Sequence, residues 1–361
     1  MDSSRNSLGD VGELIAALPA LLGFYPESSV VLVACAPPPD DVAGHLQLEA
    51  VMRADLDSCL HTDSTGIDAT VRMCLGNNVR QIAVLVIDEA LDANDTSERG
   101  RACQEFLARL RIALLEAGIE LVGGWFTTAV RAQEYWWSFL DSEHGTIPDP
   151  AASPVTLATE AATGQRIYGA RAEVVATLEQ DVGVVEAVRS HLPEAADAAE
   201  RHAAAVTAQD PHADIRHGVE LVLSYLDTTT ELTPARLAEV AVALQDSRIR
   251  DCLVGLAATS SAVPAQRLWT DLTRTLPAPA RAEAAALLAF GAYAGRTGPL
   301  AGIAVDIALE ANPKHRIGRI LRVALDAGFP PEQIYQLARE AVAHAAEVGV
   351  TLPGAEQQES L

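Results

Sequence analysis

The densest group of positive charge in the sequence lies near the end of its helical half. It comprises Lys314, His315, Arg316, Arg319 and Arg322. The three arginines recur every three residues, so on a helix they would share roughly one face. This face opposes the net charge of −23 and could receive an acidic protein partner, or a small anionic ligand carrying a carboxylate or phosphate. The alternative is ion pairing within the chain. The acids on neighbouring turns are Asp306, Glu310 and Asp326.

A second candidate is the acidic pair Asp88 and Glu89, which directly follows an apolar run at residues 84–87. Nucleotide-hydrolysing proteins place an Asp that holds magnesium and a Glu that positions water at such a strand end. Those sites also need a phosphate-binding G-x-x-x-x-G-K-[ST] loop, which this sequence lacks, and its single lysine is Lys314. The pattern therefore favours two solvated acids that end a strand, with a cleft site as the alternative.

Two further groups have patterns that favour structural roles. Ser28 and Ser29 precede an apolar strand and do not form the G-x-S-x-G turn of a serine nucleophile, so they are interpreted as turn residues. The densest group of metal-ligating types comprises His202, His212, Asp214 and His217. Its spacing matches neither H-E-x-x-H nor a zinc finger, which favours solvated side chains around a helix start. The sequence identifies no cofactor.

The charge distribution bears on possible partners. Residues 1–150 carry 9 Arg and 23 Asp or Glu, a net charge of −14, and the remaining residues carry −9. Contacts with nucleic-acid phosphates need clustered Lys and Arg, so we expect no nucleic-acid binding by either half. Charge of this sign is also repelled by anionic membranes.

The cysteines and the apolar runs indicate the compartment. The five cysteines, an odd number, are widely spaced and form no C-x-x-C pair, which is typical of free thiols in a reducing environment. The first ten residues are polar and resemble no signal peptide. No apolar run approaches the roughly 20 residues that a membrane-spanning helix needs. We therefore expect a cytoplasmic protein that is not embedded in a membrane.

The first half must position the acidic pair and the two serines. Continuous or alternating apolar runs predict strands at residues 30–36, 45–55, 81–87 and 121–130, with 135–140 as a further candidate. Residues 45–55 could form the hairpin partner of the first strand. Helices are predicted at 11–22, 65–77 and 97–117. Strands alternating with helices predict an α/β domain over residues 1–154, a mixed sheet covered by helices, that ends in the loop 141–154.

The second half must position the basic cluster, and it is predicted to be all-α over residues 155–361. The expected helices cover 170–188, 195–209, 217–225, 234–244, 248–258, 263–276, 280–295, 300–311, 316–327 and 332–348. Small residues and a proline at Ala289, Ala301, Ala308 and Pro313 match the spacing of a tetratricopeptide repeat. The next unit, from Arg316, fits poorly. We therefore predict one tetratricopeptide-like hairpin inside a helical bundle.

Residues 21–30, with the sequence L-L-G-F-Y-P-E-S-S-V, resemble an actinobacterial family of domains of unknown function. Members of that family open on a helix, continue with L-L-G-F-x-P-x-x-S and enter a hydrophobic strand. The resemblance extends through residues 136–140, 245–251 and 267–269, and so spans most of the chain. It implies a cytosolic bacterial protein and no established activity. Many relatives carry a cysteine cluster after the W-x-S-x-L stretch, whereas residues 141–154 contain no cysteine here.

These observations leave two functional hypotheses. The favoured one is a non-catalytic protein- or ligand-binding module that uses Lys314, Arg316, Arg319 and Arg322. The alternative is an enzyme, a hydrolase or a nucleotide-related one, with a site at the sheet edge between the two domains near Asp88 and Glu89. Open α/β sheets place ligands at the ends of their strands, which is the basis of that alternative.

Overall fold

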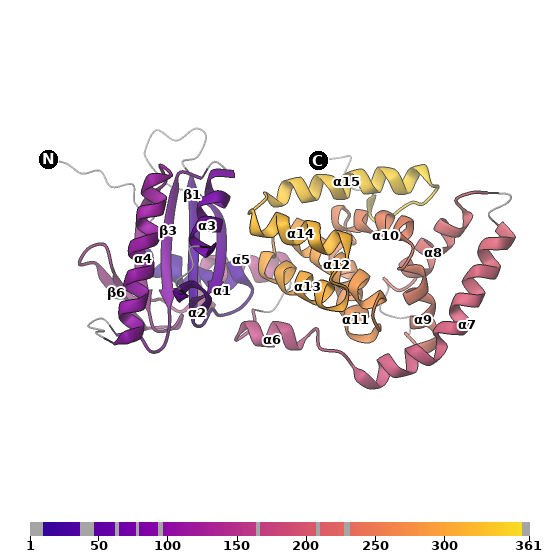
Figure 1. The fold of residues 1–361 in the computed structure, drawn as a ribbon, viewed down its shortest axis with the longest axis horizontal. Coiled ribbons are helices and arrows are strands. Elements are labelled where there is room, and N and C mark those ends of the chain that lie inside the picture. Colours follow the sequence, from indigo (N-terminus) through magenta and orange to yellow (C-terminus); the bar gives the residue numbers. More distant parts are fainter. Residues whose placement is uncertain are drawn as a thin grey trace. The chain divides into compact units, whose positions relative to one another are not determined.

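The computed structural model describes residues 10–36, 47–61, 65–76, 79–92, 97–163, 167–206, 210–226 and 232–355 (Figure 1). The chain folds into two compact units. The first holds the described residues up to Val174 together with Asp326–Phe329, and the second holds Val175–Leu325 and the described residues from Pro330 onward.

The first unit is built on a mixed sheet whose described strands have the order β2-β1-β3-β4-β5-β6. The strands are β1 (Ser29–Ala36), β2 (Gln47–Asp55), β3 (Gln81–Ile87), β4 (Glu120–Thr127), β5 (Tyr135–Ser138) and β6 (His144–Thr146). Strands β3 and β4 are parallel, and the other neighbours are antiparallel. The predicted pairing of the first two strands is confirmed, with Val31 opposite Arg53. The prediction of a mixed sheet is confirmed as well.

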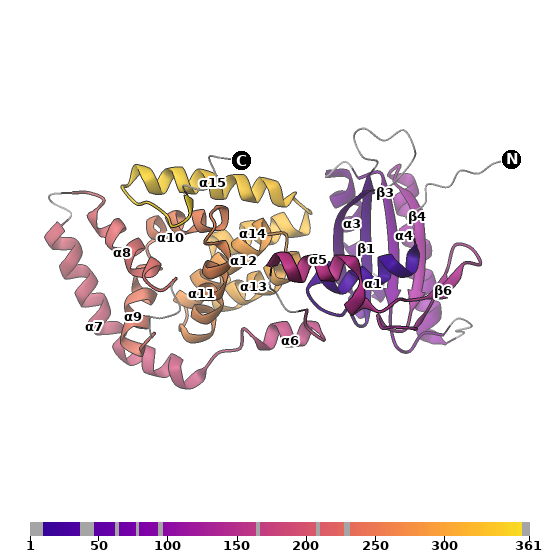
Figure 2. The ribbon, with the colours of Figure 1, turned by 180° about the vertical axis from the view of Figure 1, so that it is seen from behind.

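Helices cover both faces of this sheet. They are α1 (Val11–Leu22), α2 (Leu56–Leu60), α3 (Thr65–Gly76), α4 (Glu98–Glu116) and α5 (Pro154–Thr163). Residues Val84 and Val86 of β3 point to one face and share a buried core with Phe106 and Leu110 of α4. On the other face α1 contacts β2, and a Cβ atom at Gly12 would meet the backbone of β6, so α1 crosses the sheet (Figure 2).

The described part of the second unit consists of helices and connecting segments without a strand. After α6 (Arg171–Ala176) come α7 (Val182–Val206), α8 (Ala213–Leu223), α9 (Pro234–Ala243), α10 (Ser247–Leu253), α11 (Ala262–Thr275), α12 (Ala280–Ala294), α13 (Gly298–Ala311), α14 (Arg316–Asp326) and α15 (Pro331–Glu347). Helix α12 lies at the centre, because nearly all of its side chains are buried. It packs against α13, α11 and α15. The prediction of a helical second half is confirmed.

Several elements differ from the sequence-based expectations: α2 was not predicted, and the predicted helix at 170–188 is divided between α6 and α7. Helix α7 runs unbroken through Pro193, where two helices were predicted on either side of a break. The predicted loop at 141–154 contains the short strand β6, and α5 follows it without having been predicted. Strand β6 is only three residues long, too short for an alternating pattern, and its pairing depends on Gly145, where a Cβ atom would lie 2.9 Å from the Trp136 ring.

Candidate functional site

Helix α14 carries most of the basic cluster on its exposed side. Arg316 and Arg319 are exposed, as is Lys314 just before the helix. None of the three forms an ion pair with any residue that the structure describes. Because these side chains are three to four positions apart or adjacent to the helix start, they gather on one side of its first turns. The structure therefore brings three of the four predicted binding residues together as solvent-facing cations.

Arg322, the fourth predicted residue, is used differently. Its Nη2 atom lies 2.6 Å from Oδ1 of Asp306 and donates a hydrogen bond of 3.2 Å to the carbonyl of Gly302, both on α13. This is the internal pairing that the sequence left open as an alternative. Arg322 therefore ties α14 to α13, and its charge is partly neutralised where it lies.

The exposed side of α14 also carries apolar side chains. Ile320 is 54% exposed and Val323 is 66% exposed. They follow Arg316 and Arg319 at helical spacing, so the cations and the two branched side chains form one mixed surface, which we name the α14 face: Lys314, Arg316, Arg319, Ile320 and Val323. Sequence analysis identified its charges but not its apolar part.

The start of α14 is anchored by a buried histidine. His315 is 3% exposed, and its Nδ1 atom accepts a 3.0 Å hydrogen bond from the Gly318 backbone N–H. A ring nitrogen that accepts carries no proton, so the ring proton of the neutral side chain is on Nε2. That atom lies 3.0 Å from Oε2 of Glu283 and points its N–H at the carboxylate. The histidine thus fixes the helix on which the exposed cations lie.

Glu283 is in turn held from a second side. Nη1 of Arg250 lies 2.9 Å from the same carboxylate oxygen, and the side chains of both residues are mostly buried. Burial alone would raise the pKa of Glu283, but His315 and Arg250 outweigh it and lower the pKa below its ordinary value. This buried cluster connects α10, α12 and the start of α14, and sequence analysis missed it because its members are 32 to 65 residues apart.

Arg250 belongs to the segment 245–251 on which part of the family resemblance rested. Within that segment, Asp246 caps α10 by accepting a 2.9 Å hydrogen bond from the Arg248 N–H. The Arg248 guanidinium pairs with Asp246 at 2.6 Å and with Asp214 of α8 at 2.8 Å. The charged positions of this segment therefore join helices of the second unit.

The two predicted cleft acids, Asp88 and Glu89, have different environments. Asp88 is 2% exposed, whereas Glu89 is exposed. The Asp88 carboxylate lies 2.5 Å from the Arg99 guanidinium and accepts a 3.0 Å hydrogen bond from the Ala90 N–H. Arg99 also pairs with Asp57 at 2.8 Å. Burial would raise the pKa of Asp88, but these partners together with Ser28 lower it.

The turn at Ser28 and Ser29 explains why the L-L-G-F-Y-P-E-S-S segment has its sequence. Gly23 ends α1 in the left-handed conformation, with φ of 80°. The Ser29 hydroxyl donates to the carbonyl of Glu27 and accepts a 2.8 Å hydrogen bond from Nε of Arg53 on β2. Ser28 reaches Asp88 across the turn. The polar groups at this sheet edge thus satisfy one another, which agrees with the structural role predicted for both serines.

The histidine group of the helical unit is only partly assembled. The rings of His202 on α7 and His217 on α8 lie with their centroids 4.0 Å apart. His212 is exposed at the start of α8 and forms no cap hydrogen bond. Within the described residues no group of three metal-ligating side chains converges.

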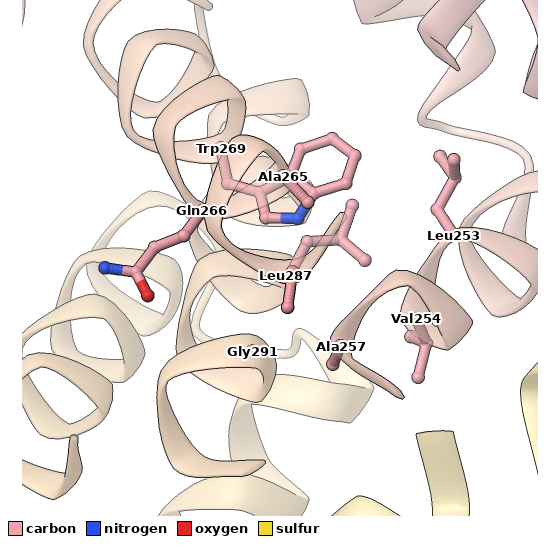
Figure 3. Close-up of a pocket in the computed structure, with 9 residues that line it drawn as sticks. Leu253, Val254, Ala257, Ala265, Gln266, Trp269, Leu287 and Gly291 are labelled. Carbon is pink, nitrogen blue, oxygen red and sulfur yellow. The ribbon is translucent and has the colours of Figure 1, made fainter. Parts of the chain in front are cut away.

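Figure 3 shows a hollow between α11, α12 and the 3₁₀ helix at Val254–Ala258. Trp269 enters the hollow from α11 and Leu287 from α12, and Leu253, Val254 and Ala257 line its other side. The volume is about 10 Å³, room for about one water molecule. Pockets for metabolites are of the order of 300 Å³ or more, so this hollow is a packing defect.

Comparison with known proteins places the chain in a family. Residues 12–332 match the family described as Domain of unknown function (DUF4192), and the chain belongs to that family. Searches of curated proteins and of solved structures found no match. Among the helices in the described part of the chain, none has the length and apolar character required to cross a membrane.

Proposed function

Because membership of this family brings no assigned activity, we propose that the chain is a non-catalytic binding module. In this proposal the α14 face binds an acidic segment of a partner protein. The observation that carries the proposal is the solvent exposure of Lys314, Arg316 and Arg319, which have no ion pair among the described residues of a chain with net charge −23. Cations left unpaired in so acidic a chain are available to a negatively charged partner.

The apolar part of the face favours a protein segment over a small anion. Ile320 and Val323 are each more than half exposed beside the cations. Binding sites on proteins combine apolar contact area with charges at the rim, and a phosphate or a free carboxylate would leave these two side chains in water. An acidic segment with apolar residues would cover both parts of the face.

The rigidity of α14 supports the same proposal. His315 caps its first turn and Arg322 ties its later turns to α13. A surface whose backbone is already fixed loses less conformational entropy when it binds. We also propose that α12 and α13, which pack against each other and lead into α14, form the tetratricopeptide-like hairpin predicted from sequence.

The experiment is co-purification of the tagged chain from its host, with partners identified by mass spectrometry. A matched pair of variants separates the α14 face from charge in general. The variant Arg316→Glu with Arg319→Glu is expected to lose the partner. The control variant Arg267→Glu with Arg274→Glu, which makes the same charge change at exposed positions of α11, is expected to retain it. If both double variants retain the partner equally well, the α14 face is not its binding site.

The enzyme hypothesis has one supporting observation, the proximity of Ser28 and the buried Asp88 at the sheet edge. Its weakness is that Asp88 is neutralised by Arg99 and has a lowered pKa, so it is a poor general base. Thermal shifts across a metabolite panel test this alternative. A compound that stabilises the native chain but not Ser28→Ala would make the enzyme the better proposal.

A further inference from the structure

The exposed turn between α13 and α14 carries the only lysine of the chain. The sequence has 26 lysine and arginine residues, and Lys314 is its single lysine. The two side chains differ in chemistry, because a guanidinium stays protonated in proteins, whereas a lysine amine has a neutral fraction that reacts as a nucleophile. Lys314 is therefore the one side chain of this sequence whose amine could form a stable amide with an acyl donor.

The backbone around Lys314 is fixed, while its side chain is exposed. The Lys314 N–H donates a 3.1 Å hydrogen bond to Oδ1 of Asn312, and the His315 N–H donates a 2.9 Å hydrogen bond to the Asn312 carbonyl. The Lys314 side chain is exposed and forms no ion pair with any described residue. A reagent can therefore reach the amine without breaking an ion pair within the described part of the chain.

Arg316 and Arg319 give this amine an unusual electrostatic environment. Both are exposed on the first turns of α14, and neither forms an ion pair with a described residue. The chain as a whole has a net charge of −23 and repels small anions, whereas the three cations of the α14 face attract them and raise their local concentration. We propose that Lys314 is an acylation site for anionic acyl donors of the acyl phosphate class, which Arg316 and Arg319 attract to its amine.

The reaction is an acyl transfer that needs no further reactant. The neutral Nζ atom of Lys314 attacks the carbonyl carbon of the acyl phosphate, and an N–C bond forms while the bond from that carbon to the phosphate oxygen breaks. The phosphate leaves with the electron pair of the broken bond, and the amine proton passes to water or to the leaving phosphate. The product is an uncharged amide at Lys314, and no atom is oxidised or reduced.

Acylation removes one of the three cations of the α14 face. Lysine acetylation deletes the charge of the side chain and its capacity to form an ion pair. This consequence rests on the proposed function, in which the three cations bind an acidic segment of a partner. An exposed ion pair contributes modestly to affinity, so acetylation of Lys314 is expected to weaken partner binding about two- to fivefold.

Incubation with acetyl phosphate at low ionic strength, followed by peptide mass spectrometry, tests the acylation site. The native chain is expected to gain an acetyl group at Lys314, and Arg316→Glu with Arg319→Glu to gain it about threefold or more slowly, because the donor is no longer attracted. The control Arg267→Glu with Arg274→Glu makes the same charge change on α11 and is expected to match the native rate. Rates with the neutral donor p-nitrophenyl acetate correct for changes in the amine itself. No acetyl group at Lys314, or a corrected rate that the α14 substitutions leave unchanged, overturns the proposal.

Co-purification separates this proposal from the proposed function. Lys314→Gln lacks the charge, as acetyl-lysine does, and is expected to retain about two- to fivefold less partner, whereas Lys314→Arg keeps the charge and should retain the partner. If Arg316→Glu with Arg319→Glu loses the partner but Lys314→Gln does not, acylation does not regulate the α14 face and that part of the proposal is wrong. If all of these variants retain the partner, the proposed function is wrong, and the acetylation rates still decide whether Lys314 is an acylation site.

Discussion

At the scale of single residues, the Arg250–Glu283–His315 cluster makes the sharpest stability prediction. Glu283→Gln removes the carboxylate charge between two buried cationic or polar partners. Leaving a buried charge without its counter-ion is costly, so we expect the free energy of unfolding to fall by about 3 kcal/mol. Urea denaturation followed by circular dichroism measures this. Glu310→Gln on α13 is the control, and a loss of similar size there would show that the effect is not specific.

The same cluster determines a pH dependence. The pKa of Glu283 is lower in the folded chain than its ordinary value of 4.5. A group of this kind adds stability above its unfolded pKa and loses that contribution as the pH falls through the folded pKa. The stability difference between the native chain and Glu283→Gln should therefore be constant near neutral pH and shrink below pH 4.5. A difference that grows on acidification would contradict the assignment.

Asp88 and Glu89 allow a matched test at adjacent positions. Asp88→Asn weakens the buried contact with Arg99 and is expected to cost about 1–3 kcal/mol of unfolding free energy. Glu89 is exposed, so Glu89→Gln should change stability by less than about 0.5 kcal/mol. Thermal and urea unfolding of the two variants measure their losses of stability relative to the native chain. Equal effects would mean that Asp88 is not the structural acid described above.

At the scale of the elements, two glycines of the helical unit, Gly291 and Gly255, should respond in opposite directions when replaced by alanine. Gly291 lies inside α12, and a Cβ atom there meets nothing within 4 Å. Gly291→Ala is therefore expected to raise the unfolding free energy by about 1 kcal/mol through helix propensity. At Gly255 a Cβ atom would lie 2.9 Å from the Val342 backbone nitrogen, so Gly255→Ala should destabilise. Melting temperatures of the two variants test both signs, and destabilisation by Gly291→Ala would show that the hollow does not accept a methyl group.

The elements also show how far sequence could predict this fold. The strand at 81–87 is recovered at both ends because it is a continuous apolar run with clear boundaries, and α4 because its apolar face repeats at helical spacing. Strand β6 could not be found, since three residues carry no periodicity and its pairing with β5 is a tertiary contact. Two helices, 170–188 and 195–209, were predicted where α7 runs from Val182 to Val206 with Pro193 inside it.

The candidate sites likewise include groups that are local in sequence, which could be predicted, and contacts between distant residues, which could not. The basic cluster around Arg316 was predictable because it is local in sequence. The contact of Ser28 with Asp88 joins residues 60 positions apart, and the contact of Arg250 with Glu283 joins residues 33 apart. Contacts of this kind depend on how the strands and helices pack, so a single sequence cannot indicate them.

At the scale of the whole molecule, the net charge of −23 is carried by both halves of the sequence. Like charges at this density repel one another in the compact state more than in the expanded chain. Added salt screens the repulsion, because the Debye length falls to about 10 Å near 0.1 M. Raising NaCl from low to physiological concentration is therefore expected to raise the melting temperature by about 2 °C or more. Sodium chloride is the appropriate salt, since sulfate stabilises proteins generally by exclusion from their surface.

Binding at the α14 face should respond to the same salt with the opposite sign. There the attraction is between exposed cations and an acidic segment, and screening weakens it. A salt series that follows both the melting temperature and the amount of co-purified partner thus separates two effects of charge in one protein. If the melting temperature rises with NaCl while the partner dissociates, the result agrees with acidic groups that repel one another within the chain and with a partner bound through the cations of the α14 face. A melting temperature that falls with NaCl would mean that attractive ion pairs contribute more to stability than the repulsion of the net charge. Partner binding that does not change with NaCl would mean that Ile320 and Val323, and not the cations, bind the partner.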